Sequence, residues 1–107
     1  MPMYLIRARF TTSGISGVKQ EGGTSRERAV KKAVESLGGR LEAFYFGFGS
    51  ADTYSIVELP DNESAAAMSA AVSSSGAAVT EVVVLLTPAQ IDAAIERTVD
   101  YLPPIKG

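Results

Sequence analysis

The chain has no cysteine and no histidine among its 107 residues. Without cysteine it can form no disulfide and offers no thiolate nucleophile. Without histidine as well, the usual zinc, haem and Ser-His arrangements are excluded, so we expect no metal and no cofactor. An excess of positive charge is also missing, since the formal net charge is -2. Nucleic-acid binders generally need a positive field to displace counterions from phosphates, so we expect no nucleic-acid partner.

A long apolar run is missing from the first ten residues, where Arg7 and Arg9 interrupt the hydrophobic side chains. This segment is neither a signal peptide nor a membrane span by pattern, so we expect a cytoplasmic protein with no membrane partner. The length and the hydrophobic content of 46% suit one domain with one core. We assign that domain to residues 1–97 and an extended tail to residues 98–107.

The first strand is predicted over residues 3–10, where apolar and polar side chains alternate with a period of two. Residues 11–23 are rich in Gly and Ser, and Ile15 and Val18 could anchor one helical turn there. The spacing of Thr24 and Glu27 fits a capping box, which predicts a helix that begins at Thr24. We expect it to end at the pair of glycines at 38–39.

Two antiparallel strands are predicted over residues 40–48 and 53–59, which are aromatic and β-branched runs joined by a short turn. A second helix over residues 65–72 follows the capping groups of residues 61–64. A fourth strand covers residues 77–86, and a capping box at 87–90 starts a short terminal helix. The order β, α, β, β, α, β predicts an α+β ferredoxin-like fold, a four-stranded antiparallel sheet with helices on one face.

Strict alternation assigns each strand residue to one face of this sheet. The set expected to face the helices, and so to form the core, is Ile6, Ala8, Phe10, Leu41, Ala43, Tyr45, Val57, Leu59, Val82, Val84 and Leu86. The set expected on the opposite side, which we call the uncovered face, is Leu5, Arg7, Arg9, Glu42, Phe44, Phe46, Phe48, Tyr54, Ile56, Glu58, Val79, Glu81, Val83 and Leu85. Apolar patches of this size commonly mark association surfaces, so we expect a homodimer in which sheet faces sheet.

The first strand is central in the expected order, which places Arg7 and Arg9 between Glu58 on one neighbour and Glu81 on the other. Ion pairs there could fix the orientation of two protomers. Alternatively, the paired sheets enclose a cavity whose aromatic walls bind a small organic molecule while an arginine holds its anionic group. The candidate ligand-binding residues are Arg7, Arg9, Phe44, Phe46, Tyr54, Glu58 and Glu81.

Three other motifs favour ordinary structural roles. Gly47 and Gly49 begin like a nucleotide-binding loop but lie in a hairpin and open no helix. Asp52 and Tyr54 could pair as acid and phenol, although Asp is common in turns for local hydrogen bonding. The basic side chains of residues 26–32 are interleaved with acids and suit a solvated helix face.

The chain resembles the GYD-domain family. The matching elements are Met-Pro-x-Tyr at 1–4, Thr-x-x-Gly-Ile at 11–15, Leu-Gly-Gly-Arg-Leu at 37–41, Phe-Tyr at 44–45, Gly-x-x-Asp at 49–52, Ile-Val-Glu at 56–58 and Pro-Asp at 60–61. The resemblance implies a ferredoxin-like domain of the dimeric α/β-barrel type and no established reaction, so it gives no catalytic residues. Family members typically have Tyr directly before the Asp, where this chain has Ala51.

Two functions therefore stay open from the sequence. The first is a non-enzymatic homo-oligomeric module that binds a small organic ligand between paired sheets. The second is a cofactor-independent enzyme that acts on a small aromatic or carbonyl compound within the barrel. In the second case Asp52, Tyr54, Glu58 and the arginines are the conceivable acid, base or oxyanion groups.

Overall fold

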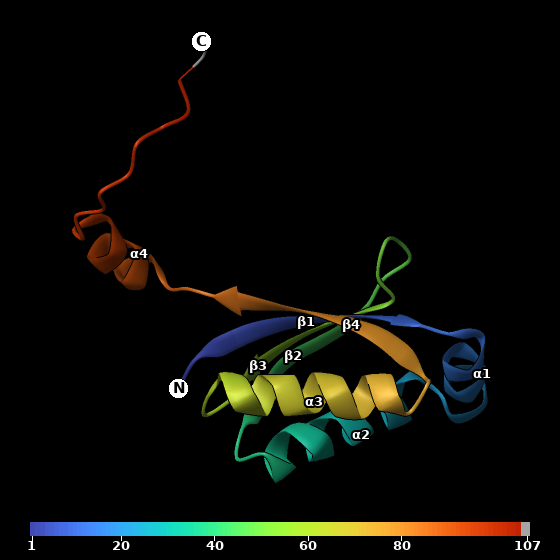
Figure 1. The fold of residues 1–107 in the computed structure, drawn as a ribbon. Coiled ribbons are helices and arrows are strands. Elements are labelled where there is room, and N and C mark those ends of the chain that lie inside the picture. The colour runs from blue at the N-terminus through green and yellow to red at the C-terminus, as the bar shows by residue number, and fades with distance from the viewer. Residues whose placement is uncertain (106–107) are drawn as a thin grey trace.

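A computed structural model describes residues 1–105 and shows an α+β fold in which helices cover one face of a four-stranded sheet (Figure 1). All strand pairs are antiparallel, and the strand order is β2-β3-β1-β4. The predicted ferredoxin-like fold is therefore confirmed. The elements are β1 (Met3–Phe10), α1 (Thr12–Glu21), α2 (Gly23–Ser36), β2 (Arg40–Phe46), β3 (Thr53–Glu58), α3 (Asn62–Ser74), β4 (Ala78–Leu85) and α4 (Pro88–Ile95).

The core lies between the sheet and helices α2 and α3. Its buried members are Tyr4, Ile6, Val34, Val57, Leu59, Ala65 and Met68. Tyr4 of the central strand lies opposite Val57 of β3, and its hydroxyl donates a hydrogen bond to Asn62 at the start of α3. Burial of the ring raises the pKa of the Tyr4 phenol, and the carboxylates of Asp61 and Glu63 raise it further.

The segment before α2 differs from the sequence prediction. Residues 12–21 form a ten-residue helix, α1, whose first turn is capped by the Thr11 side chain, which accepts a hydrogen bond from the Gly14 amide. Helix α2 begins at Gly23 with Gly22 as its N-cap, and no side chain caps it. The predicted capping box at Thr24 and Glu27 is therefore wrong, because both residues already lie inside the helix.

The other helix ends follow their predicted signals. Gly38 takes a φ of 81° just after α2, which ends the helix as expected of a glycine there. Asp61 caps α3 by accepting a hydrogen bond from the Ser64 amide. Thr87 and Gln90 form the predicted capping box at the start of α4.

A β-bulge at Glu42 reverses the faces of β2 relative to strict alternation. Leu41 pairs with Val57, but Ala43 pairs with Ile56, so one residue between them is unmatched. Downstream of the bulge Phe44 lies opposite the buried Ser55. The prediction that placed Phe44, Phe46 and Phe48 on the uncovered face and Ala43 and Tyr45 in the core is therefore wrong.

Phe44 and Phe46 instead lie on the helix side of the sheet. Their rings meet edge to face with centroids 5.3 Å apart. A methyl group added at Gly23 would lie 3.1 Å from the Phe46 ring, which places that ring against the first residue of α2. Phe48 lies beyond the end of β2 and is fully exposed in the loop of residues 47–52.

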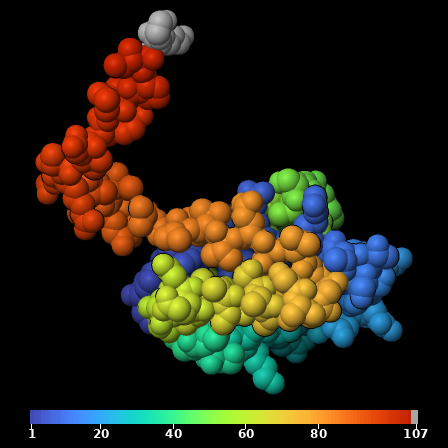
Figure 2. Space-filling model, viewed as in Figure 1, coloured from blue at the N-terminus to red at the C-terminus, as the bar shows by residue number. Residues whose placement is uncertain are grey.

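The end of β4 leads into an arm that the domain does not bury, which we define as residues 86–105. Val84 and Leu86 were expected in the core, but both are more than half exposed, because β4 is an edge strand that leaves the domain here. Figure 2 shows the arm standing clear of the rest of the molecule. The arm exposes the apolar side chains of Leu86, Ile91, Ile95, Val99, Tyr101, Leu102 and Ile105. The last two residues of the predicted tail lie outside the described part of the chain.

Candidate functional site

The uncovered face of the sheet is the candidate site, and the strand register arranges its side chains in rows. One row is apolar and crosses all four strands as Ala43, Ile56, Leu5 and Val83. The next row combines aromatic and charged groups as Tyr45, Tyr54, Arg7 and Glu81. The row on the other side of the apolar one contains Arg40, Glu58, Met3 and Leu85. An apolar stripe thus separates two polar ends.

Arg7 is the centre of the first polar end. Its Nε lies 3.7 Å from the Glu81 carboxylate, and its Nη2 donates a hydrogen bond of 3.3 Å to the Ser50 hydroxyl. The guanidinium carbon also lies 5.9 Å from the centre of the Tyr54 ring, a cation–π contact. The Arg7 Nε is buried and makes no hydrogen bond within residues 1–105. One strong donor at this end therefore has no acceptor at hydrogen-bond distance.

A hollow of about 240 Å³ lies beside Arg7. Its walls come from β1, β4 and the loop of residues 47–52, and they include Arg7, Arg9, Ser50, Ala51, Val79 and Glu81. The loop rises on the side of the sheet opposite the helices (Figure 1). Arg7 and Arg9 therefore line one hollow together with Glu81, and an anionic group is the ligand chemistry that two guanidinium groups favour.

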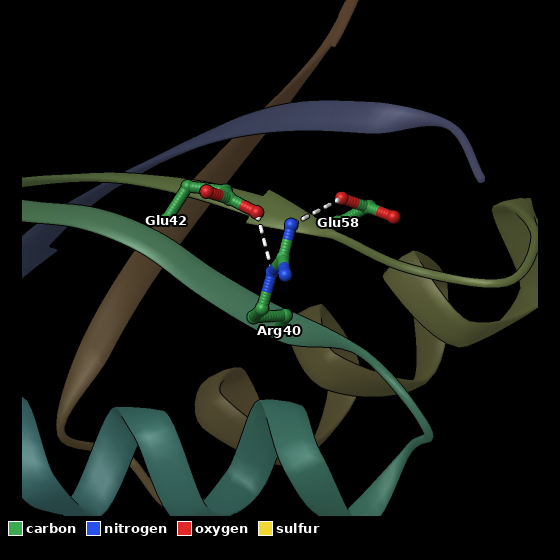
Figure 3. Close-up of polar contacts among 3 residues, drawn as sticks. All are labelled: Arg40, Glu42 and Glu58. Atoms are coloured by element: carbon green, nitrogen blue, oxygen red, sulfur yellow. Dashed lines mark hydrogen bonds and ion pairs between the residues drawn. The ribbon is translucent and has the colours of Figure 1, made fainter.

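Arg40 is the centre of the second polar end. Its Nε donates a hydrogen bond of 2.7 Å to Glu42, and its Nη2 lies 3.4 Å from Glu58 (Figure 3). The hydrogen bond to Glu42 raises the pKa of the Arg40 guanidinium, and the charges of Glu42 and Glu58 add to this effect.

Glu58 therefore does not flank Arg7 and Arg9, which corrects the ion-pair arrangement expected from the sequence. The register places Glu58 opposite Met3, four residues along the central strand from Arg7. Glu81 does lie opposite Arg7, whereas Arg9 lies opposite Val79. The seven candidate ligand-binding residues are consequently divided among three places: Arg7, Arg9, Tyr54 and Glu81 at one end of the uncovered face, Glu58 at the other, and Phe44 and Phe46 on the helix side.

Asp52 holds the hairpin loop in place. Its carboxylate accepts a hydrogen bond of 2.8 Å from the Phe10 amide, its own amide donates to the Ala8 carbonyl, and its carbonyl accepts from the Gly47 amide. These contacts give Asp52 the turn role that the sequence favours. Its carboxylate is engaged with the backbone, and within residues 1–105 no hydrogen bond joins it to Tyr54, as an acid and phenol pair would require.

Sequence reasoning missed two members of the site. Tyr45 is 70% exposed on the uncovered face beside Tyr54, and Arg40 organises both glutamates of the second polar end. The i, i+2 spacing of Arg40 and Glu42 on one strand was the available signal for an ion pair. No comparable signal marked Tyr45, because its face depends on the bulge.

Within residues 1–105 no group of three His, Cys, Asp or Glu side chains is placed to hold a metal ion. Over the same residues, each helix is too short or too polar to cross a membrane.

Comparison with known proteins gives one positive result. The model of the GYD domain family matches residues 4–95, which covers both polar ends of the uncovered face and the helices behind the sheet. Neither the curated proteins nor the solved structures include a match to the chain.

Proposed function

The chain belongs to the GYD domain family, and from this premise we propose that it is a homodimer that binds a small organic anion between its paired sheets. The uncovered faces of two copies form the interface. The hollow beside Arg7 and Arg9 receives the anionic group of the ligand. The observation that carries the proposal is the apolar row at the middle of a sheet face that the chain's own helices leave open.

The charges of the uncovered face suit contact between identical surfaces. Its strands carry the arginines 7, 9 and 40 and the glutamates 42, 58 and 81, so three positive charges balance three negative ones. Each polar end contains both signs. Two copies related by a twofold axis can therefore meet without a large like-charge repulsion, which commonly opposes wrong pairings.

The size of the face sets the expected strength of the dimer. Strands of about eight residues, spaced by about 4.8 Å, give a face of roughly 500 Å² per copy. Two faces then bury about 1,000 Å², which is the lower bound for a specific interface. The arm rises toward the side where the second copy would sit (Figure 1), and its exposed Ile91 and Ile95 can add apolar contact. We expect a dimer of modest affinity that the arm strengthens.

The ligand half of the proposal depends on the hollow and on Arg7. At about 240 Å³ the hollow is smaller than typical ligand pockets, which begin near 300 Å³. A second copy laid over the uncovered face would close and enlarge it. The Arg7 Nε, which makes no hydrogen bond within residues 1–105, and the neighbouring Arg9 then supply the donors for a carboxylate, and Tyr54 supplies an aromatic wall.

The dimer is tested by sedimentation velocity on the wild type and on Val83→Lys across micromolar concentrations. Val83 lies in the apolar row, so a lysine there should shift the population to monomer with little change in the melting temperature. The matched control is Ala67→Lys, which adds the same charge to an exposed position of α3. A wild type that is monomeric throughout the range would remove the basis of the proposal.

The ligand is tested with benzoate, a rigid carboxylate with an apolar ring. In amide NMR spectra, benzoate should shift the signals of Ser50, Ala51 and Val79 in the wild type. Arg7→Met should weaken benzoate binding by about tenfold, because a charge-assisted hydrogen bond is lost. Dimerisation without any shift of these signals would leave the interface standing and exclude this anion site.

A further inference from the structure

A second hollow lies on the opposite side of the sheet from the proposed interface. It has a volume of about 420 Å³ and opens between helices α2 and α3 above the end of β1. Helix α2 packs on β2 and helix α3 packs on β4, so the two helices leave the central strand partly uncovered between them. This volume falls within the range of ordinary small-molecule pockets.

The hollow exists because small side chains line it. Six alanines contribute to the walls, namely Ala8, Ala29, Ala33, Ala71, Ala77 and Ala78. Larger apolar groups, including Phe10, Val30 and Met68, form the floor and sides. Ala29 and Ala71 are exposed, so the space is open to solvent between the two helices. An apolar surface of this kind favours a ligand with an apolar body.

Among residues 1–105, only two polar side chains line this hollow, those of Arg26 and Ser75. Ser75 is already engaged, because its hydroxyl donates to the Val72 carbonyl and accepts from the Ala77 amide. Arg26 is different, since its Nε is buried and has no hydrogen-bond partner within residues 1–105. A buried donor without an acceptor is costly, and a bound anion would satisfy it.

We propose that this hollow binds a monocarboxylate with an apolar body, such as a medium-chain fatty acid, with its carboxylate on Arg26 and its chain between α2 and α3. One guanidinium group matches one carboxylate, whereas a phosphate dianion would call for more donors than the walls contain. The site lies within a single copy of the chain. It therefore does not depend on dimerisation or on the anion site at Arg7.

The probe is sodium octanoate, and 1-octanol is its neutral counterpart. Binding of each to the full chain is measured by amide NMR. Octanoate should shift the signals of Ala29, Ala71 and Ala78 and bind about tenfold more tightly than octanol, because only the carboxylate pairs with Arg26. Arg26→Met should reduce octanoate affinity about tenfold, to the level of octanol. Arg28→Met is the matched control on the same helix, because Arg28 does not line this hollow.

A filling variant gives an independent readout. Ala71→Phe places a ring at the open edge of the hollow and should abolish octanoate binding while the circular dichroism spectrum stays native. Val83→Lys should leave octanoate binding unchanged, which separates this site from the interface.

Four outcomes overturn the proposal, and the first three are equal affinities for octanoate and octanol, unchanged affinity in Arg26→Met, and shifts confined to the uncovered face. A fourth is that the Ala29 and Ala71 signals move with protein concentration alone and stop moving when Ile91 and Ile95 are replaced by Ser. The occupant would then be the arm of a second copy.

Discussion

Phe44 of β2 lies directly opposite Ser55 of β3, and this pairing turns Phe44 and Phe46 to the helix side of the sheet. Ser55 is buried, and its hydroxyl donates a hydrogen bond to the Ile6 carbonyl on the central strand. The pairing exists because the bulge at Glu42 shifts the strand by one residue. The same shift brings Tyr45 to the uncovered face, opposite Tyr54.

Deletion of Glu42 should therefore be tolerated. Without this residue Leu41 and Ala43 become neighbours that pair with Val57 and Ile56 in regular order, so every downstream side chain keeps its face. The hydrogen bond between Arg40 and Glu42 is lost, but it is exposed and contributes little. Nuclear Overhauser contacts between Phe46 and Gly23 should persist, with only a small change in the denaturation midpoint.

Deletion of Tyr45 is the contrasting variant. It keeps Phe44 in place but moves Phe46 to the uncovered face, away from Gly23. The contact with Gly23 should disappear and the midpoint should fall clearly below that of the Glu42 deletion. Equal midpoints for the two deletions would contradict the register described for β2.

Replacement of glycine by alanine should have opposite effects on stability at two positions of α1. A Cβ atom at Gly14 would lie 1.9 Å from the Ala77 carbonyl oxygen, so Gly14→Ala must displace backbone and should cost about 1–3 kcal/mol. A Cβ atom at Gly17 would meet no packed neighbour among residues 1–105 within 4 Å, and Gly17→Ala should stabilise the protein by about 0.5–1 kcal/mol through lower chain entropy. Chemical denaturation of both variants measures the difference, and the same sign for both would refute this packing.

Asp61 makes the start of α3 sensitive to acid. Hydrogen bonds from the Ser64 hydroxyl and amide lower the pKa of the Asp61 carboxyl in the folded protein. A group whose pKa is lower when folded stabilises the protein fully above its unfolded pKa of about 3.9, and this stabilisation is lost as the pH falls through the folded value. Asp61→Ala should therefore lower the melting temperature at pH 7, and the deficit should shrink below about pH 4.

Asp61→Asn distinguishes the cap from its charge. Asparagine also caps helices well but does not titrate in this range. Its difference from the wild type should accordingly be smaller than that of Asp61→Ala at pH 7. A deficit of Asp61→Ala that stays constant from pH 7 to pH 3 would show that the Asp61 carboxylate does not carry the pH dependence.

The small side chain of Ala51 should keep the hollow beside Arg7 open. This alanine is buried and lines the hollow. Asp52 fixes the backbone at this point, so Ala51→Tyr should direct its ring into the space lined by Arg7 and Arg9. Benzoate binding should then fall by at least about tenfold because the pocket is occupied. Undiminished binding would mean that the hollow is not the anion site; Ala67→Tyr on α3 serves as the control.

The fold was predictable from the sequence because its signals are local. The alternation of β1, the glycines after α2, Asp61 before α3 and the capping box at Thr87 each act within a few residues, and the structure confirms all four. Helix α1 was missed because its composition is rich in Gly and Ser. Its capping residue Thr11 is anchored by donating its hydroxyl hydrogen to the Gly76 carbonyl, a contact between residues 65 positions apart.

The site was less predictable because it depends on one unmatched residue. Nothing in the run of residues 40–46 marks Glu42 as a bulge, yet the bulge decides whether Phe44 or Tyr45 belongs to the uncovered face. The pairing partner of Glu58 was missed for a related reason. Side chains on the same face can meet only if the strand register brings them together, and the register places Glu58 near Arg40 instead of Arg7.

Helix α4 has only eight residues, and its Ile91 and Ile95 side chains are exposed. Isolated helices shorter than about 12 residues are marginal in water, even with a good capping box. The helix content of α4 should therefore depend on whether α4 contacts another surface, and not on whether the domain is folded. If the ellipticity at 222 nm rises with protein concentration while the melting of the sheet stays the same, helix formation in α4 reports self-association of the chain.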